Sequence, residues 1–230
     1  MFLLNLKNVR YKAIVFFGVM ILVFCVLIKG EKLDALQAFR NVFGGNELFR
    51  PIAIISFIIY VVLIQFMHID SIMLILRNDT YLRVRYNTKK VLFNKILWMI
   101  FLVNILCVII MFISWRISTV LCGCNLELIN WKQLIEICFR GFLTSNILII
   151  IQSISLIKRN ETDTFFIMNM VSILLVLLSF TNLKVLSICP FYLEYGGLVF
   201  NVGLCIMYMM ICILIYRKLY MEREHEQYGN

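Results

Sequence analysis

Charged residues are scarce in this sequence: they make up 15% of its 230 residues, whereas hydrophobic residues make up 62%. An average soluble domain carries about 25% charge, and a chain of this length has no core large enough to hold so much apolar surface. The mean hydropathy of +0.92 leads to the same conclusion. The composition therefore excludes an ordinary soluble domain and indicates that lipid surrounds most of the chain.

Residues that perform chemistry are also few. The sequence has two histidines, His68 and His225, and it lacks the H-E-x-x-H, G-x-S-x-G and Walker A motifs of metalloproteases, hydrolases and nucleotide-binding proteins. His68 ends an apolar run, where an interfacial residue is the simpler interpretation and a proton relay the alternative. We predict no catalytic residue, no metal and no cofactor, so any ATPase that drives this protein must be a separate subunit.

Cysteine is better represented, with eight residues. Four of them fall within apolar runs, where a thiol behaves as a small hydrophobe: Cys25, Cys107, Cys205 and Cys212. Cys122 and Cys124 have one residue between them, not the two of redox and zinc motifs. For Cys122, Cys124, Cys138 and Cys189, on the expected outer side, free thiols are the simpler interpretation and a disulfide among them is the alternative.

Six apolar runs are candidates for membrane-spanning helices, which need about 20 residues to cross ~30 Å of hydrocarbon. They comprise residues 13–28, 51–68, 96–115, 141–157, 164–183 and 198–216. Trp98 and Trp115 lie at the two ends of the third run, as in an aromatic belt. The predicted fold class is an all-α, polytopic membrane protein with six transmembrane helices within residues 13–216.

Cations indicate which segments face the cytoplasm, because Lys and Arg near span ends resist translocation. With both termini and the segments 69–95 and 158–163 inside, 14 of the 22 Lys and Arg residues are cytoplasmic. We therefore expect a multi-pass protein of the cell membrane with a cytoplasmic amphipathic N-terminus, residues 1–12, and a cytoplasmic tail, residues 217–230. The net charge of +9 is spread over span ends, so anionic lipid rather than nucleic acid is the expected partner.

Two outer segments carry helix signals. Leu33, Leu36, Phe39 and Phe43 recur at helical spacing, which predicts a short interfacial helix. The stretch Asn130–Gln133 has the spacing of a capping box. It predicts a second short helix that leads into the fourth span.

Charged residues are missing from the predicted span interiors, although ion-coupled carriers usually need such groups at depth. This absence disfavours that class of transporter. The strongly polar side chains at depth are six amides: Gln65, Asn104, Asn146, Gln152, Asn169 and Asn201. Hydrogen bonding between helices is the preferred interpretation of this set, and the lining of a transport path is the alternative.

The segment 69–95 has the most distinctive pattern in the sequence. It contains six cations against Asp70 and Asp79, but also the apolar stretch Ile72–Leu76 and, further on, aromatic and aliphatic residues. Membrane topology and contact with lipid headgroups explain the cations but not the apolar residues. The apolar residues need a second surface, and helices that dock in a partner's cleft have this mixture. We predict an ATPase-docking site that consists of Tyr81, Leu82, Arg83, Val84, Arg85, Tyr86, Lys89 and Lys90.

The same segment resembles the cytoplasmic loop of small six-span ABC-2-type permeases, which occur beside bacteriocin and lantibiotic ATPases in Gram-positive bacteria. The motif covers Arg77–Lys95, and the layout of spans and loops covers the whole chain. The resemblance rests on Arg85-Tyr86, Thr88, Lys89-Lys90, the cluster Val91-Leu92-Phe93 and Lys95. Leu92-Phe93 departs from the pattern, which has tryptophan there.

The resemblance implies the permease subunit of an ABC exporter for a peptide or an amphipathic antimicrobial, for export or for self-immunity. Its partners would be a separate ABC ATPase subunit, a second permease copy or a sister permease, membrane lipid and a peptide substrate. Two alternatives stay open. One is a membrane immunity protein that sequesters a toxin without an ATPase. The other is the six-span substrate-capture subunit of an importer, which is disfavoured because Val15–Val26 has no small-residue dimer face.

Overall fold

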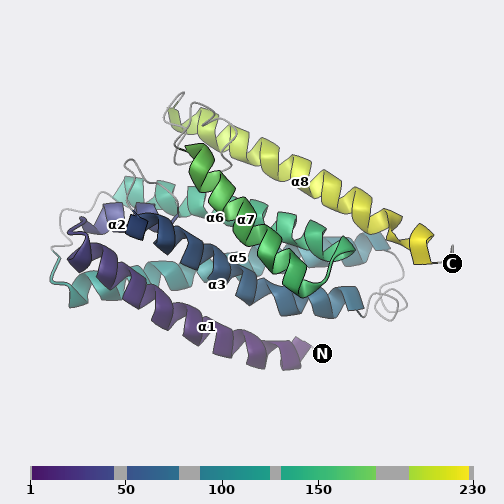
Figure 1. Ribbon diagram of the computed structural model, residues 1–230, viewed down its shortest axis with the longest axis horizontal. Coiled ribbons are helices and arrows are strands. Elements are labelled where there is room, and N and C mark those ends of the chain that lie inside the picture. Colours follow the sequence, from purple (N-terminus) through teal and green to yellow (C-terminus); the bar gives the residue numbers. More distant parts are fainter. Residues whose placement is uncertain (1, 44–50, 78–88, 125–130, 180–196, 228–230) are drawn as a thin grey trace.

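The computed structural model describes residues 2–43, 51–77, 89–124, 131–179 and 197–227, and every regular element among them is a helix (Figure 1). In chain order these elements are α1 (Phe2–Cys25), the π-helical turn η1 (Val26–Gly30), α2 (Ala35–Val42), α3 (Pro51–Arg77), α5 (Lys89–Leu121), α6 (Trp131–Lys158), α7 (Glu161–Ser179) and α8 (Gly197–Gln227). The predicted all-α fold class is thereby confirmed.

Five of these helices are long and apolar enough to cross a membrane. They contain the segments Arg10–Gly30, Ile54–Met73, Lys90–Leu121, Trp131–Lys158 and Val202–Glu222. The protein is therefore a multi-pass, membrane-embedded helical bundle. α7 is not among the five; its 19 residues rise about 28 Å, close to the hydrocarbon thickness. A sixth span that includes α7 stays a prediction.

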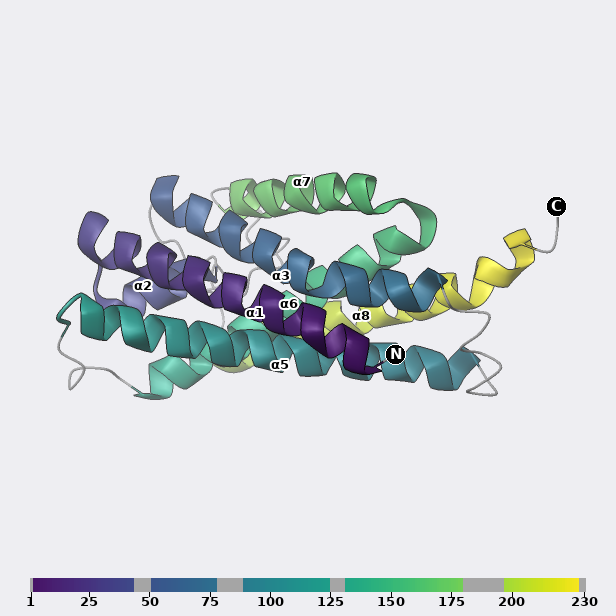
Figure 2. The ribbon, with the colours of Figure 1, turned by 90° about the horizontal axis from the view of Figure 1, so that it is seen from below.

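The long helices lie side by side and alternate in direction along the chain (Figures 1 and 2). The start of α1, the end of α3, the start of α5 and the end of α8 lie at one end of the bundle, which we call the terminal end. η1, α2 and the start of α6 lie at the opposite, distal end. α3 packs on α1, α2, α5, α6 and α7, and α5 packs on α1, α2, α3, α6 and α8. α6 likewise packs on α2, α3, α5, α7 and α8. α3, α5 and α6 are therefore the central helices, and α3 and α5 are the two that flank residues 78–88.

Five helices extend by at least a turn beyond the predicted spans. α1 already begins at Phe2, α3 continues to Arg77, α5 comprises Lys89–Leu121, α6 begins at Trp131, and α8 continues to Gln227. The predicted cytoplasmic segment 69–95 is thus helical at both of its ends, and most of the predicted tail belongs to α8. Apolar runs report only the part of a helix that meets lipid, so they do not predict these additional turns.

Aromatic packing accounts for the extension of α8. Phe93 of α5 packs against Tyr216 and Tyr220, with ring centroids 5.2 Å and 5.8 Å apart. Further along, Lys218 and Glu222 approach to 3.9 Å one turn apart, a spacing that supports an exposed helix. Contacts with α5 and within α8 therefore continue the helix past its apolar run.

α2 is the short helix predicted after the first span, and its existence is confirmed. The Asp34 side chain accepts a hydrogen bond from the backbone N–H of Gln37 at 2.7 Å, which satisfies an otherwise free donor of the first turn. Phe39 is completely buried in the bundle, and Nε1 of Trp115 in α5 donates to the carbonyl of Ala35 at 2.7 Å. The apolar face of α2 therefore packs on the distal end of the bundle rather than on lipid.

α6 is one continuous helix, so the short helix predicted before the fourth span forms its first turns. Gly141 of α6 lies against the residue that follows α2: a Cβ atom at Gly141 would stand 2.5 Å from the ring of Phe43. The same ring packs edge-on against Tyr60 of α3, with centroids 5.0 Å apart. Glycine at this position allows the Phe43 ring to fit between α3 and α6.

Candidate functional site: polar contacts around helix α3

Of the predicted ATPase-docking residues, the structure describes only the two lysines at the end of the set. Tyr81–Tyr86 lie outside the described residues. Lys89 and Lys90 begin α5, and Lys90 is exposed. The end of α3 and the start of α5, which flank the docking segment, lie at the same end as the start of α1 and the end of α8 (Figure 2).

Two of the predicted amides bond to each other between α5 and α6. Nδ2 of Asn104 donates to Oδ1 of Asn146 at 2.9 Å, and Nδ2 of Asn146 donates to the carbonyl of Phe142 at 2.8 Å. Both side chains are completely buried. Oδ1 of Asn104 has no hydrogen-bond partner among the described residues. The pair thus links two helices and leaves one buried amide oxygen unsatisfied.

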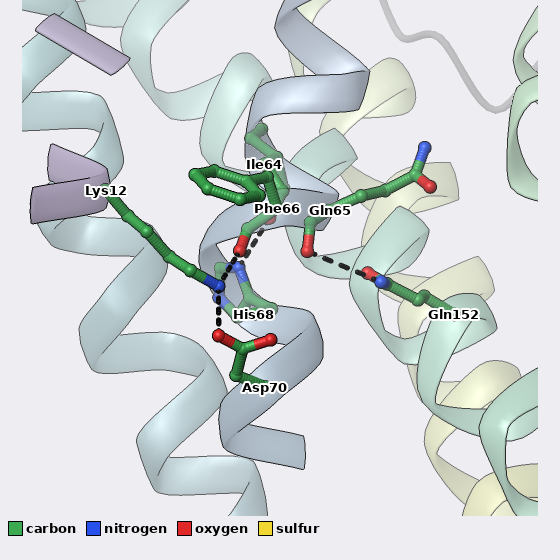
Figure 3. Close-up of polar contacts among 7 residues, drawn as sticks. All are labelled: Lys12, Ile64, Gln65, Phe66, His68, Asp70 and Gln152. Atoms are coloured by element: carbon green, nitrogen blue, oxygen red, sulfur yellow. Dashed lines mark hydrogen bonds and ion pairs between the residues drawn. The ribbon is translucent and has the colours of Figure 1, made fainter. Parts of the chain in front are cut away.

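Gln65 and Gln152 form a second contact, between α3 and α6. Nε2 of Gln152 donates to the backbone carbonyl of Gln65 at 3.5 Å, and the side chain of Gln65 points away from this contact (Figure 3). Within the described part of the chain, neither amide atom of Gln65 has a partner, and Oε1 of Gln152 has none. A buried amide without a partner costs free energy. Water or a polar group of a ligand would therefore bind favourably here.

The remaining two amides do not join these pairs. Asn169 lies on α7, where its Nδ2 donates to the carbonyl of Phe165 in the same helix at 2.9 Å. Asn201 belongs to α8, and its side chain lies outside the described part. The predicted set of six is therefore divided among the helices, with four members in two contacts on α3, α5 and α6.

A hydroxyl pair that the sequence analysis did not single out also joins α3 and α6. The hydroxyls of Tyr60 and Ser145 are 2.6 Å apart, and Oγ of Ser145 donates to the carbonyl of Gly141 at 2.7 Å. Because Ser145 has one hydroxyl proton, which goes to the carbonyl, Tyr60 is the donor between the two hydroxyls. Ser145 precedes Asn146, so neighbouring residues of α6 bond to α3 and to α5.

A charged pair connects α1 with α3. Nζ of Lys12 lies 2.7 Å from Oδ2 of Asp70 and donates to the carbonyl of Phe66 at 2.6 Å (Figure 3). The same Nζ lies 4.3 Å from the centroid of the Phe66 ring, within cation–π range. Lys12 is 6% exposed, whereas the Asp70 side chain is 48% exposed. The cation is therefore buried, and its anion reaches the surface.

Lys12 and Asp70 belong to the apolar helical segments Arg10–Gly30 and Ile54–Met73, close to one end of each. The predicted spans, 13–28 and 51–68, stopped short of these residues because charge ended each apolar run. The signal that could have identified the pair is the apolar stretch that continues after Asp70.

His68 is completely buried between helices rather than exposed at a membrane surface. Its Nδ1 donates to the carbonyl of Ile64 at 3.0 Å, one turn earlier in α3. Nε2 faces the backbone of Ile100 in α5 without a hydrogen bond of ordinary geometry. The imidazole ring lies beside the Lys12 side chain (Figure 3) and completes the contact of α1, α3 and α5.

The site holds amides, hydroxyls, one ion pair and one imidazole. Among the described residues, no three His, Cys, Asp or Glu side chains are placed to hold a metal ion. No protein-family model matches this chain, and neither a curated protein nor a solved structure is similar to it. The arrangement suits the binding of uncharged polar groups and hydrogen bonding between helices.

Proposed function

We propose that this protein is the permease subunit of an ABC exporter for a peptide or an amphipathic antimicrobial, either for export or for self-immunity. A separate ATPase subunit would dock on the segment between α3 and α5 and drive transport across the cell membrane. The observation that carries this proposal is the central position of α3 and α5 in the bundle.

A docking segment can drive transport only if the helices that it joins move the rest of the bundle. α3 contacts α1, α2, α6 and α7, and α5 contacts α8 as well as α1, α2 and α6. Packed helices shift as rigid bodies against one another. A displacement at the terminal ends of α3 and α5 would therefore be transmitted to all other described helices.

The buried amides support a polar substrate path beside these helices. Gln65 and Gln152 have amide atoms without partners in the described interior, and amide groups hydrogen bond equally well to the backbone of a peptide. Such a site binds an uncharged peptide segment without a buried ion pair. Movement of α3 against α6 would expose or close it.

The outer surface of α8 supports an assembly of two permeases. Its apolar side chains are largely exposed in the single chain: Ile206, Met207, Met210, Ile211, Leu214 and Ile215. Either lipid or a second permease covers such a face. We propose a second copy or a sister permease, because six spans are half of a typical ABC exporter pathway.

The proposal is tested by co-purification of the ATPase with the tagged chain from membranes in which both are expressed. Any ABC ATPase encoded next to this chain is the first to test. Aromatic anchors dominate interface energies, so Tyr86→Ala is expected to weaken docking by about 1–3 kcal/mol, or about fivefold or more. Arg85→Lys is expected to lose ATPase as well, because lysine cannot form the bidentate pair of arginine.

The matched control is Arg217→Lys, an exposed arginine of α8 at the same end of the bundle. This variant is expected to retain the ATPase in the wild-type ratio. If Tyr86→Ala and Arg85→Lys insert normally, retain the ATPase in that ratio and leave transport unchanged, the segment is only a topological anchor. A chain that never binds the ATPase would instead fit an immunity protein.

A further inference from the structure

α1 and α5 run side by side in the same direction and in one fixed register (Figure 2). Oγ of Ser114 in α5 donates to the carbonyl of Phe17 in α1 at 3.4 Å. One turn further on, Oγ of Ser118 donates to the carbonyl of Ile21 at 3.1 Å. In both contacts the α5 residue follows the α1 residue by 97 positions. This constant offset is the signature of parallel helices in register.

The same offset brings Cys25 opposite Cys122 one turn later. Cys25 is the last residue of α1, and Cys122 directly follows the end of α5. The side chains of Cys122 and Cys25 are near neighbours. Both cysteines are half-buried free thiols. Two neighbouring thiols at the ends of two registered helices, still reachable by reagents, are suited to form a disulfide.

We propose that Cys25 and Cys122 are a redox pair whose disulfide joins the distal ends of α1 and α5. The oxidant is a disulfide, either of a small-molecule thiol or of a thiol oxidoreductase. One cysteine thiolate attacks a sulfur of this disulfide, which forms a mixed disulfide and releases one thiol; the second cysteine then displaces the other. Two electrons pass to the oxidant, and the two thiol protons end on its two product thiols.

The disulfide would restrict movement at one end of the bundle only. At the distal end it would fix α1 to α5. Near the terminal end, the ion pair of Lys12 and Asp70 holds α1 to α3. Oxidation would therefore prevent any motion in which the distal end of α1 separates from α5, while the contact with α3 remains adjustable.

Other described cysteines do not offer the same pairing. Cys107 is completely buried within α5, Cys138 lies on α6, and Cys205 and Cys212 lie on α8. Cys124 is the one further thiol close to Cys122, and its position two residues later departs from the offset of 97 shared by the serine contacts. The register therefore favours Cys122 over Cys124 as the partner of Cys25.

The test uses the full chain in lipid nanodiscs, treated either with oxidised glutathione or with a reductant. Free thiols are then alkylated, and the peptides are mapped by mass spectrometry. We expect oxidised protein to yield Cys25 and Cys122 in one linked peptide pair, both protected from alkylation. Cys25→Ser and Cys122→Ser should each abolish the link, and Cys124→Ser should retain it.

A register control separates this geometry from general reactivity. Leu22 is 67% exposed on the lipid side of α1, so Cys25→Ser combined with Leu22→Cys should link to Cys122 at least about tenfold less than the native pair, since a disulfide needs its two Cβ atoms within about 4.5 Å. Equal linking through Leu22→Cys would overturn the proposal. So would a dominant link from Cys124, or full alkylation of Cys25 and Cys122 after oxidation.

Discussion

Nζ of Lys12 lies 2.7 Å from Oδ2 of Asp70, and only the cation of this pair is buried. The two side chains join α1 to α3. Removal of one partner from a fully buried pair is costly, because it leaves a charge without compensation. The unequal burial of Lys12 and Asp70 makes the consequence depend on which partner is removed.

Asp70→Asn is expected to destabilise the protein more than Lys12→Met. The first variant leaves a buried ammonium that has neutral partners but no compensating negative charge, which should cost about 1–2 kcal/mol after allowance for solvent screening of Asp70. The second removes the buried charge and leaves a carboxylate that is half solvated. Unfolding free energies in mixed micelles measure both effects.

The control for this comparison is Lys218→Met, a lysine whose side chain is 75% exposed. Its unfolding free energy should stay within about 0.5 kcal/mol of the wild type. A larger loss of stability in Lys12→Met than in Asp70→Asn would contradict the assignment of the buried partner.

The hydrogen bond between Asn104 and Asn146 is expected to contribute a measurable coupling energy. In a double-mutant cycle with alanine at both positions, the coupling should be about 0.6 kcal/mol and at most about 1.7 kcal/mol, as for other hydrogen bonds between membrane helices. The control cycle pairs Asn104 with Asn169, which bonds within α7, and should give no coupling. Equal coupling in both cycles would show that the bond itself contributes nothing.

The sequence predicted the existence of the helices better than their ends. Apolar runs identified the five long apolar helices, because lipid-facing residues are apolar on every turn. The ends depend on neighbours: Phe93 packs on Tyr216 and Tyr220 and so continues α8. Whether α7 crosses the membrane depends on the lipid and the helices around it, so the count of six spans stays a prediction.

The polar contacts were predictable as residues but not as partners. The amides Asn104 and Asn146 stood out because they interrupt apolar runs. That they bond to each other depends on the packing of α5 on α6, which a single sequence does not report. The pairing of Lys12 with Asp70 was not predicted, because each lies just beyond a predicted span and their contact requires α1 to lie beside α3.

Gly141→Ala is expected to destabilise the bundle, because the added methyl group would overlap the Phe43 ring at 2.5 Å. That ring is itself packed against Tyr60 and cannot move freely. Overpacking of this kind costs typically about 1–3 kcal/mol, measurable as a lower free energy of unfolding. Phe43→Leu combined with Gly141→Ala should recover part of the loss.

Gly203→Ala provides the matched control for this substitution. Gly203 also lies within a helix, but apart from the adjacent backbone of that helix and its two chain neighbours nothing described lies within 4 Å of the position of its added Cβ. Alanine there should be neutral or stabilise the protein by up to about 1 kcal/mol, since glycine is the poorer helix former. Equal destabilisation by the two alanines would contradict the close approach at Gly141.

Trp115→Phe is expected to loosen α2 from the bundle. The substitution keeps an aromatic ring of smaller size but removes the N–H that donates to the carbonyl of Ala35, and the loss of one hydrogen bond costs about 0.5–1.5 kcal/mol. Faster proteolysis of the segment around α2 would report the change. Trp98→Phe, at an exposed tryptophan, should not alter the rate, and identical rates in both variants would contradict the role of the bond.

The most direct measurement of the proposed function is native mass spectrometry of the tagged, wild-type chain. The chain is extracted from membranes of cells that also express the candidate ABC ATPase. A permease subunit predicts a complex that contains this ATPase together with two copies of the 27.1 kDa chain, or one copy and a sister permease. The chain alone, or bound only to itself while folded ATPase is present in the same membranes, would contradict it.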